Sequence, residues 1–203
     1  KTINRDIEVE LRMDESSGCT YDSVVVNRCW TLYSGAAFTS AKYGNGISFD
    51  GSNDYVANWN DYISASPYRY VDLTISAWVY TTSSPSPQVS QRILTHSSSS
   101  AANQQYALSI DGNGKLYFLG DAGAFEQGGM NISNSMVNIN QWNHVAITYD
   151  GQAVKLYLDG NLDLTHPVVD NFNSSAIGHF FIGDRFDGAE TFEGEIDNIN
   201  AWN

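Results

Sequence analysis

Apolar and polar residues alternate along short stretches of the chain, and turns separate these stretches. Between residues 71 and 80, Val, Leu, Ile, Ala and Val alternate with Asp, Thr, Ser, Trp and Tyr, and similar alternation runs through 145–149 and 154–158. A period of two residues is typical of a strand whose two faces meet different surroundings. No stretch of ten residues has a sustained period of 3.6, so the pattern predicts an all-β fold.

The turns are marked by Asp-Gly and Asn-Gly sequences. Asp150-Gly151 lies between two alternating stretches and predicts a hairpin, because glycine adopts positive φ angles without steric cost. Asp159-Gly160 and the segment 111–114 predict further tight turns. Regular spacing of short strands and turns is typical of a two-sheet sandwich or jelly roll.

Length and charge limit the class of protein. The chain has 203 residues, and 10 Lys and Arg against 23 Asp and Glu give a net charge of −13. All-β domains of roughly 200 residues are common, so we expect residues 1–203 to form a single domain. The scarcity of cations argues against nucleic acid as a partner, and no apolar run is long enough for membrane insertion. Carboxylates beside glycine favour a hard cation such as calcium, although acidity also serves solubility.

The two cysteines lie near the N-terminus. Cys19 and Cys29 are separated by a short polar segment, which fits a disulfide that closes a local loop. Such a bond persists in an oxidising compartment, so we expect an extracellular or cell-surface location. Two free thiols in a cytosolic protein are the alternative.

Five segments in a fixed order resemble one known family. They are Tyr-Gly-Asn-Gly-Ile-Ser-Phe-Asp-Gly-Ser-Asn-Asp-Tyr-Val from 43, Leu-Thr-Ile-Ser-Ala-Trp-Val from 73, Trp-Asn-His-Val-Ala-Ile-Thr-Tyr-Asp-Gly from 142, Val-Lys-Leu-Tyr-Leu-Asp-Gly from 154, and an ending made of Phe-Ile-Gly-Asp from 181 and Phe-Glu-Gly-Glu-Ile-Asp-Asn-Ile-Asn from 192. Together they resemble the laminin-G-like jelly-roll domains of the concanavalin A-like lectin and glucanase superfamily, as found in bacterial surface, adhesin and pilus-biogenesis proteins.

The resemblance implies a fold and a metal site. It implies an all-β, two-sheet antiparallel jelly-roll sandwich with its first and last strands together. It also implies a Ca²⁺ ion bound near Asp14, by the loop that ends at Gly51, and by Asp197. Asp50 and Asp54 serve equally well in Asx turns, and Asp14 also suits a plain turn.

The C-terminal carboxylates raise the possibility of catalysis. Glu193, Glu195 and Asp197 alternate and would share one face of a strand, with neighbours roughly 7 Å apart. Glycosidases use carboxyl pairs at comparable separations of about 5–9.5 Å. Related glucanases instead have Glu-x-Asp-x-Glu on a central strand, so we expect no enzymatic activity. The histidines, His96, His144, His166 and His179, lack the spacing of a zinc site.

Aromatic residues divide into two groups. Trp78, Trp142, Tyr149, Tyr157 and Phe181 lie in strand patterns, and we expect them mostly in the core. A second group lies in polar, turn-rich segments and could stack on sugar rings: Trp59, Tyr62, Tyr68, Tyr70 and Phe125.

The residues favour a non-catalytic binding module. We expect an extracellular, calcium-containing domain of a larger bacterial adhesin or surface protein, which recognises a glycan or a cell-surface ligand through its loops. A glycan hydrolase or lyase acting through Glu193 or Glu195 is the second hypothesis. A structural spacer domain is the third, because a fold alone does not choose among functions.

Overall fold

The chain consists of short strands joined by turns and loops. A computed structural model describes residues 7–25, 27–59, 72–82, 90–97, 104–120, 131–167, 178–185 and 188–202. These residues form sixteen strands and no helix. The described residues therefore include no helix that could cross a membrane.

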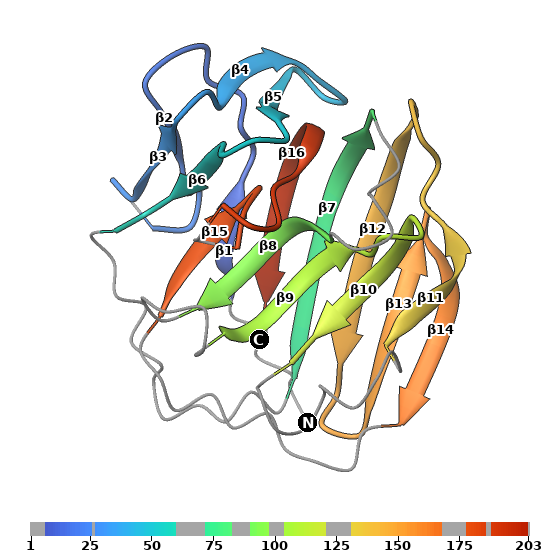
Figure 1. The fold of residues 1–203 in the computed structure, drawn as a ribbon. Helices are drawn as coiled ribbons and strands as arrows, with labels where there is room; N and C mark the ends of the chain where they lie inside the picture. Colours follow the sequence, from blue (N-terminus) through green and yellow to red (C-terminus); the bar gives the residue numbers. More distant parts are fainter. Residues whose placement is uncertain are drawn as a thin grey trace.

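The strands form two antiparallel sheets, called here sheet A and sheet B (Figure 1). Sheet A contains β1 (Ile7–Leu11), β4 (Ala37–Ser40), β5 (Asn45–Asp50), β7 (Leu73–Thr81), β12 (Trp142–Tyr149), β13 (Ala153–Leu158), β14 (Asn161–Pro167) and β16 (Glu193–Trp202). Sheet B contains β2 (Cys19–Tyr21), β3 (Cys29–Tyr33), β6 (Tyr55–Ala57), β8 (Gln91–Ser97), β9 (Gln104–Ile110), β10 (Lys115–Leu119), β11 (Ile132–Met136) and β15 (His179–Ile182).

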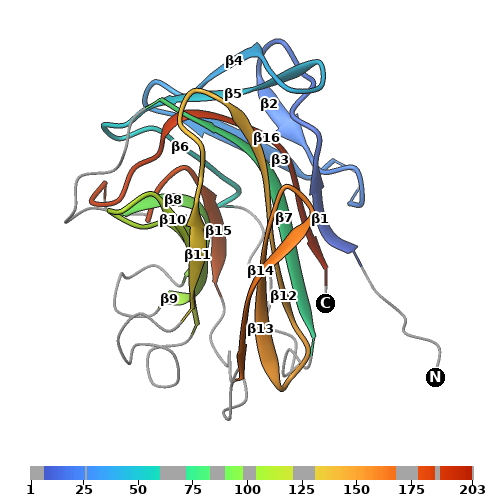
Figure 2. The same ribbon diagram turned by 90° about the vertical axis from the view of Figure 1, so that its right-hand side faces the viewer.

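The two sheets stack as layers, which Figure 2 shows from the side. The order in sheet A is β14-β13-β12-β7-β16-β5-β4, with β1 also paired to β16. The order in sheet B is β11-β10-β9-β8-β15-β6-β3-β2. This arrangement confirms the predicted two-sheet antiparallel sandwich and places the first strand beside the last.

Alternation of side chains produces the core. In β12, every second residue is buried, including Val145, Ile147 and Tyr149. Their partners on β7 include Ile75 and Ala77, which are fully buried too. Complete burial of a valine or isoleucine side chain stabilises the fold by roughly 1.5–3 kcal/mol. The residues between them face away from sheet B, as the sequence pattern predicts.

The predicted hairpins are present. The Asp150 carboxylate accepts hydrogen bonds from the backbone N–H groups of Gln152 (3.0 Å) and Ala153 (2.9 Å), which closes the turn between β12 and β13. Gly151 has φ = 81°, in the left-handed region that glycine favours. The turn at Asp159-Gly160 has two successive positive φ angles, 48° and 77°, as type I′ hairpins require.

Strand β16 has a central place in sheet A. It pairs along its length with β7, through its first half with β5, and through its second half with β1. The register shifts between Asp197 and Asn200, where Asn198 has φ = 50°. Asp197 therefore lies where the partner on one side of β16 changes from β5 to β1.

The predicted disulfide joins Cys19 on β2 to Cys29 on β3. Their Cα atoms are 5.7 Å apart on adjacent strands, and the bond closes a loop with a sequence separation of 10. Tyr21 on β2 is 52 % exposed, so this edge of sheet B buries little apolar surface. The covalent link holds an edge strand that packing alone holds weakly.

We predict that replacing both cysteines with serine lowers the free energy of unfolding by about 2–3 kcal/mol, because the unfolded chain loses its closed loop. Urea unfolding of the wild type, with and without reductant, measures this loss. The reductant should not change the unfolding of the double variant. An equally stable double variant would show that the bond adds nothing to the fold.

Candidate functional site

The outer face of sheet A, which points away from sheet B, bears a group of partly exposed aromatic residues. Trp78 and Tyr80 alternate along β7 with buried Ala77 and Val79. Trp142 and His144 alternate in the same way along β12. The strand pairing sets Trp142 opposite Tyr80 and His144 opposite Trp78. Directly opposed residues project from the same face of a sheet, so these rings lie together.

These residues form two parallel rows with carboxylates of β16. The first row is Glu195, Tyr80 and Trp142, and the second row is Asp197, Trp78 and His144. The ring centroids of Tyr80 and Trp142 are 5.7 Å apart, and those of Trp78 and His144 are 5.2 Å apart. Two residues along a strand separate the rows, which corresponds to roughly 7 Å.

The loop between β4 and β5 covers part of the second row. The Tyr43 ring, 55 % exposed, meets Trp78 edge-on with centroids 5.7 Å apart. The Lys42 ammonium lies 4.5 Å from the centroid of Trp78 and 5.9 Å from that of Tyr43. Both distances lie within the range of a cation–π interaction, so the second row already holds a positive charge.

Burial changes the charge balance of the ionisable groups in these rows. Desolvation raises the pKa of the Glu195 carboxyl above its usual value. Desolvation also lowers the pKa of His144, which the nearby Asp159 carboxylate opposes. His144 is therefore predominantly neutral near pH 7, so the rows contain few positive charges.

Two carboxylates meet where the chain ends come together. Asp197 is fully buried, and its carboxylate accepts hydrogen bonds from the Tyr43 N–H (2.8 Å) and the Asn198 side chain (2.8 Å). The Asp14 carboxylate accepts the N–H of Asn45 (3.3 Å). The pKa of Asp197 is raised, first by burial and also by the charge of Asp14.

This pair could hold a calcium ion. Among the described residues, no ion pair involves Asp197, so its buried charge has no cationic partner there. Carboxylate and carbonyl oxygens are the ligands that calcium prefers, and the carbonyl groups of Asp14 and Glu15 lie beside the same loop. No group of three or more acidic, His or Cys side chains suitable for a metal occurs within the described ranges, so carbonyl oxygens or water would complete the coordination.

The structure does not bring Gly51 to this pair. Gly51 lies beside Glu193, four residues before Asp197 on β16, which corresponds to about 13 Å along the strand. The Asp50 carboxylate instead accepts the N–H of Ser52 (2.8 Å) in an Asx turn. Asp54 is buried, and its carboxylate accepts the N–H groups of Gly35 (2.6 Å) and Asp50 (2.8 Å). The loop that adjoins Asp14 and Asp197 is residues 42–45.

Of the predicted ligand-binding residues, Trp59 lies within the described part of the chain, next to sheet B. Its ring centroid lies 5.1 Å from the ring centroid of His179 and 5.1 Å from that of Phe181. Its indole N–H is hydrogen-bonded to the Tyr55 hydroxyl. Trp59 is partly exposed. The other four predicted residues lie outside the described residues: Tyr62, Tyr68, Tyr70 and Phe125.

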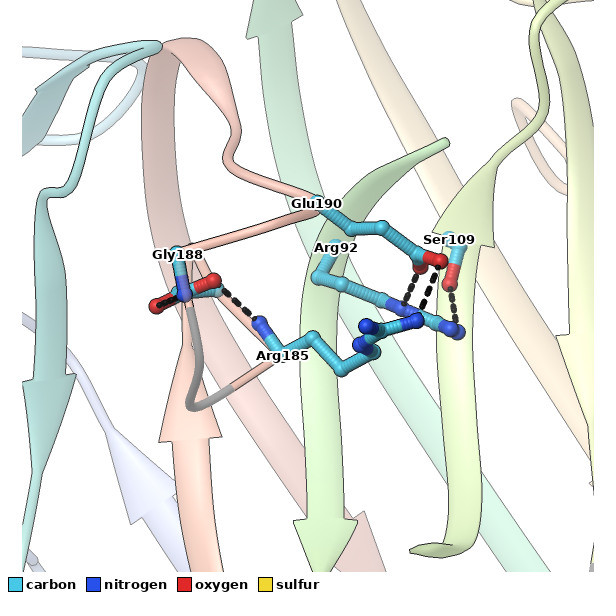
Figure 3. Close-up of polar contacts among 6 residues, drawn as sticks. Arg92, Ser109, Arg185, Gly188 and Glu190 are labelled. Carbon is cyan, nitrogen blue, oxygen red and sulfur yellow. Dashed lines mark hydrogen bonds and ion pairs between the residues drawn. The ribbon is translucent and has the colours of Figure 1, made fainter. Parts of the chain in front are cut away.

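Sheet B contains a buried arginine (Figure 3). Arg92 on β8 is 2 % exposed, forms an ion pair with Glu190 and donates a hydrogen bond to the Ser109 hydroxyl (2.9 Å). The Arg185 guanidinium lies 3.0 Å from the same Glu190 carboxylate. Burial lowers the pKa of Arg92, and the charge of Glu190 opposes this shift. One carboxylate therefore balances two guanidinium groups and ties the segment before β16 to sheet B.

The expectation for the strand aromatics was partly wrong. Tyr149 and Phe181 are buried as predicted. Trp78, Trp142 and Tyr157 are partly exposed on the outer face of sheet A. The alternation itself contained the signal, because Trp78 occupies a polar position of its strand. These residues are the functional candidates that sequence reasoning assigned to the core.

The three C-terminal carboxylates do share the outer face of β16. Asp197 is engaged by backbone and side-chain donors, and the Glu193 carboxylate accepts a hydrogen bond from the Thr82 hydroxyl (3.2 Å). Among the described residues, the Glu195 carboxylate accepts no hydrogen bond and forms no ion pair. An acid–base pair would need two available carboxyl groups.

The fold defines a class of two-sheet lectin-like domains. A family model described as "Concanavalin A-like lectin/glucanases superfamily" (Laminin_G_3) matches residues 50–203. The chain belongs to this family. No curated protein sequence matches the chain.

Solved structures with the same jelly-roll fold include binding domains and parts of glycosidases. Domain 4 of AbnA, an extracellular arabinanase of Geobacillus stearothermophilus solved with arabinotriose, has a TM-score of 0.70 at 18 % identity, with 98 % of this chain and 92 % of that chain covered. The binding domain of botulinum neurotoxin DC in complex with rat synaptotagmin II has a TM-score of 0.69 at 14 % identity, with coverages of 97 % and 48 %. This chain therefore spans about half of that binding domain.

A third similar structure is the sialidase of Trypanosoma rangeli, with a TM-score of 0.60 at 20 % identity. The alignment covers 97 % of this chain and 30 % of the sialidase. Identities at this level establish the shared fold, and each partner or substrate is a property of the neighbour.

We predict that replacing Glu190 with glutamine destabilises the protein by about 3–5 kcal/mol, because buried Arg92 loses its counter-charge. Arg185→Gln is the control, because it leaves the Arg92–Glu190 pair intact. Arg185 is more exposed than Arg92, so its loss should cost less than about 1 kcal/mol. Urea unfolding of both variants measures the difference. Equal stabilities of the two variants would contradict the assignment of Glu190 as the counter-charge of Arg92.

Proposed function

We propose that this chain is an extracellular, non-catalytic binding module that recognises a glycan through the outer face of sheet A. The two rows of partly exposed aromatic residues carry this proposal. Aromatic rings offer flat apolar surfaces to the C–H groups of a sugar ring, and Tyr, Trp and His add polar atoms for its hydroxyl groups. The recognising residues lie on paired strands, which hold them more rigidly than loops would.

The sheet face replaces the loop residues as the preferred site. Trp78, Tyr80, Trp142 and His144 lie together on two neighbouring strands, whereas Trp59 packs into a separate cluster on sheet B. The arabinanase domain solved with arabinotriose and the neurotoxin binding domain solved with synaptotagmin support a binding role for this fold.

The disulfide supports the proposed wider setting of the module. A bond between Cys19 and Cys29 supports an oxidising compartment outside the cytosol. We place the module within a larger polypeptide, such as a bacterial adhesin or surface protein, which would present the aromatic face to a glycan or cell surface.

We predict that Trp142→Ala weakens glycan binding by about thirtyfold, because a tryptophan that is covered by the ligand typically contributes about 2 kcal/mol to binding. A glycan array identifies the ligand, and calorimetric titration measures its dissociation constant. Tyr21→Ala is the control, because Tyr21 is an exposed aromatic residue of sheet B. Unchanged affinity in Trp142→Ala, or a wild-type protein that binds no glycan, would refute the proposal.

Glycan hydrolysis is the second candidate function. The half-buried Glu195 carboxyl, with its raised pKa, resembles a general acid and favours this alternative. The engagement of Asp197 and Glu193 argues against it, because each already accepts hydrogen bonds from the protein. Release of reducing ends from a bound glycan, abolished by Glu195→Gln, would replace the binding module with a hydrolase.

We further propose that calcium binds Asp14 and Asp197 and has a structural role. The ion would neutralise a fully buried carboxylate and would join the segment after β1, the loop 42–45 and β16. Gly44 has a positive φ of 74° and lies against the Asp14 carboxylate, so the backbone of the loop 42–45 approaches this acid closely.

We predict that calcium raises the melting temperature of the wild type and that chelator lowers it, because the ion binds only the folded state. Asp197→Asn removes the charge and keeps one acceptor oxygen, so this variant should lose most of the calcium dependence. Asp54→Asn is the matched control, because Asp54 is a buried acid bonded to other loops, so its melting should still respond to calcium. Identical wild-type melting in calcium and in chelator would refute the proposed site.

A further inference from the structure

The two rows on sheet A have the same plan but differ in charge. Each row sets a carboxylate of β16 beside a ring of β7 and a ring of β12. The second row holds the Lys42 ammonium against Trp78, at 4.5 Å from the ring centroid. In the first row, no ammonium or guanidinium group from the described residues lies over Tyr80 or Trp142 or pairs with Glu195.

The second row shows what this arrangement can hold. Lys42 contributes a cation to a ring face in water, although the chain has only 10 Lys and Arg residues. A cation is attracted to the negative face of an aromatic ring, and a neighbouring carboxylate strengthens the attraction. The first row offers the same two elements to a ligand.

The surroundings of the first row are acidic. Glu193 lies two residues from Glu195 on β16, and Asp50 lies opposite Glu193 on β5. Asp159 accepts the N–H of His144 (2.8 Å) at the other side of the rows. With a net charge of −13, the chain as a whole attracts cations and repels anionic sugars.

We propose that the first row binds the ammonium group of an amino sugar, so that the ligand is a glycan with free amines, such as a glucosamine oligomer. The ammonium group would lie beside the Glu195 carboxylate and over the rings of Tyr80 and Trp142, while the sugar ring packs on the same two rings. Amide formation at the amine removes its charge and leaves Glu195 without a partner. This inference rests on the proposed glycan-binding function and specifies its ligand class.

A glycan fits this face better than a lysine-rich protein segment. The two rings of the first row lie side by side on a sheet surface, with centroids 5.7 Å apart and planes inclined by 55°. Together they can contact both the ring of a sugar and its charged substituent, whereas a lysine side chain would use the carboxylate and one ring.

The test compares three probes by calorimetric titration in calcium, at a pH where the amines are protonated. The probes are a glucosamine oligomer, the N-acetylglucosamine oligomer of equal length, and an oligolysine of equal charge. We expect the glucosamine oligomer to bind about tenfold more tightly than the acetylated one, which corresponds to a cation–π and ion-pair contribution at a partly exposed site. The preference should weaken as salt concentration rises.

Variants separate the contribution of the Glu195 charge from that of the two rings. Glu195→Gln should abolish the preference for free amines, and Lys42→Met should increase it, because the second row then also accepts a cation. Asp150→Asn removes one negative charge at the distant β12–β13 turn and retains its acceptor oxygen, so it should leave the preference unchanged. Thermal melting confirms that each variant is folded.

The outcomes distinguish the inference from the function on which it rests. Equal binding of the two sugar oligomers, or a preference that survives in Glu195→Gln, overturns the amino-sugar assignment and leaves glycan binding intact. Binding of oligolysine alone overturns it in favour of a basic protein segment. Failure of both sugar oligomers also overturns the assignment, and the glycan array with Trp142→Ala then decides the proposed function separately.

Discussion

The last strand, β16, is the element on which sheet A depends. It supplies backbone hydrogen bonds to β7 on one side and to both β5 and β1 on the other. Without β16, the half of the sheet with β12 and β13 would have no connection to β4 and β5. The strand comes at the end of the sequence, so its pairings join segments more than 100 residues apart. Long-range pairing of this kind makes the final strand decisive for the fold.

The two faces of β16 and β7 separate the buried core from the proposed glycan-binding surface. Ile196 on β16 and Val79 on β7 are fully buried against sheet B, whereas Glu195 and Tyr80 project outward at neighbouring positions. A shift of one residue in the register would exchange these faces and bury the carboxylate in place of the isoleucine. The hydrophobic effect therefore fixes the positions of the outward residues, although they contribute little to the core. This coupling gives the rows a rigid geometry.

Sequence alone was informative where local physics decides the structure. Alternation in 145–149 and the turn at Asp150-Gly151 are properties of adjacent residues, and the structure has both the strand and the hairpin. Trp78 was expected mostly in the core because it lies in a strand pattern, yet it occupies an outward position of that strand. Gly51 was grouped with Asp197 by a resemblance, whereas the pairing of β5 with β16 sets them apart. That register arises from contacts between distant segments, which composition and spacing do not encode.

The loop 42–45 connects the acids at the chain ends with the aromatic face. Asp197 and Asp14 accept backbone N–H groups of Tyr43 and Asn45, and the same loop sets Tyr43 and Lys42 against Trp78. An ion at the two acids would hold this loop and thereby keep Lys42 on the second row. The first row lies on the same three strands, β16, β7 and β12, but two residues further along them than the row that holds Lys42, so it should respond less to the ion. Because coupling between two sites is reciprocal, a ligand that displaces Lys42 would weaken ion binding, and one confined to the first row would not.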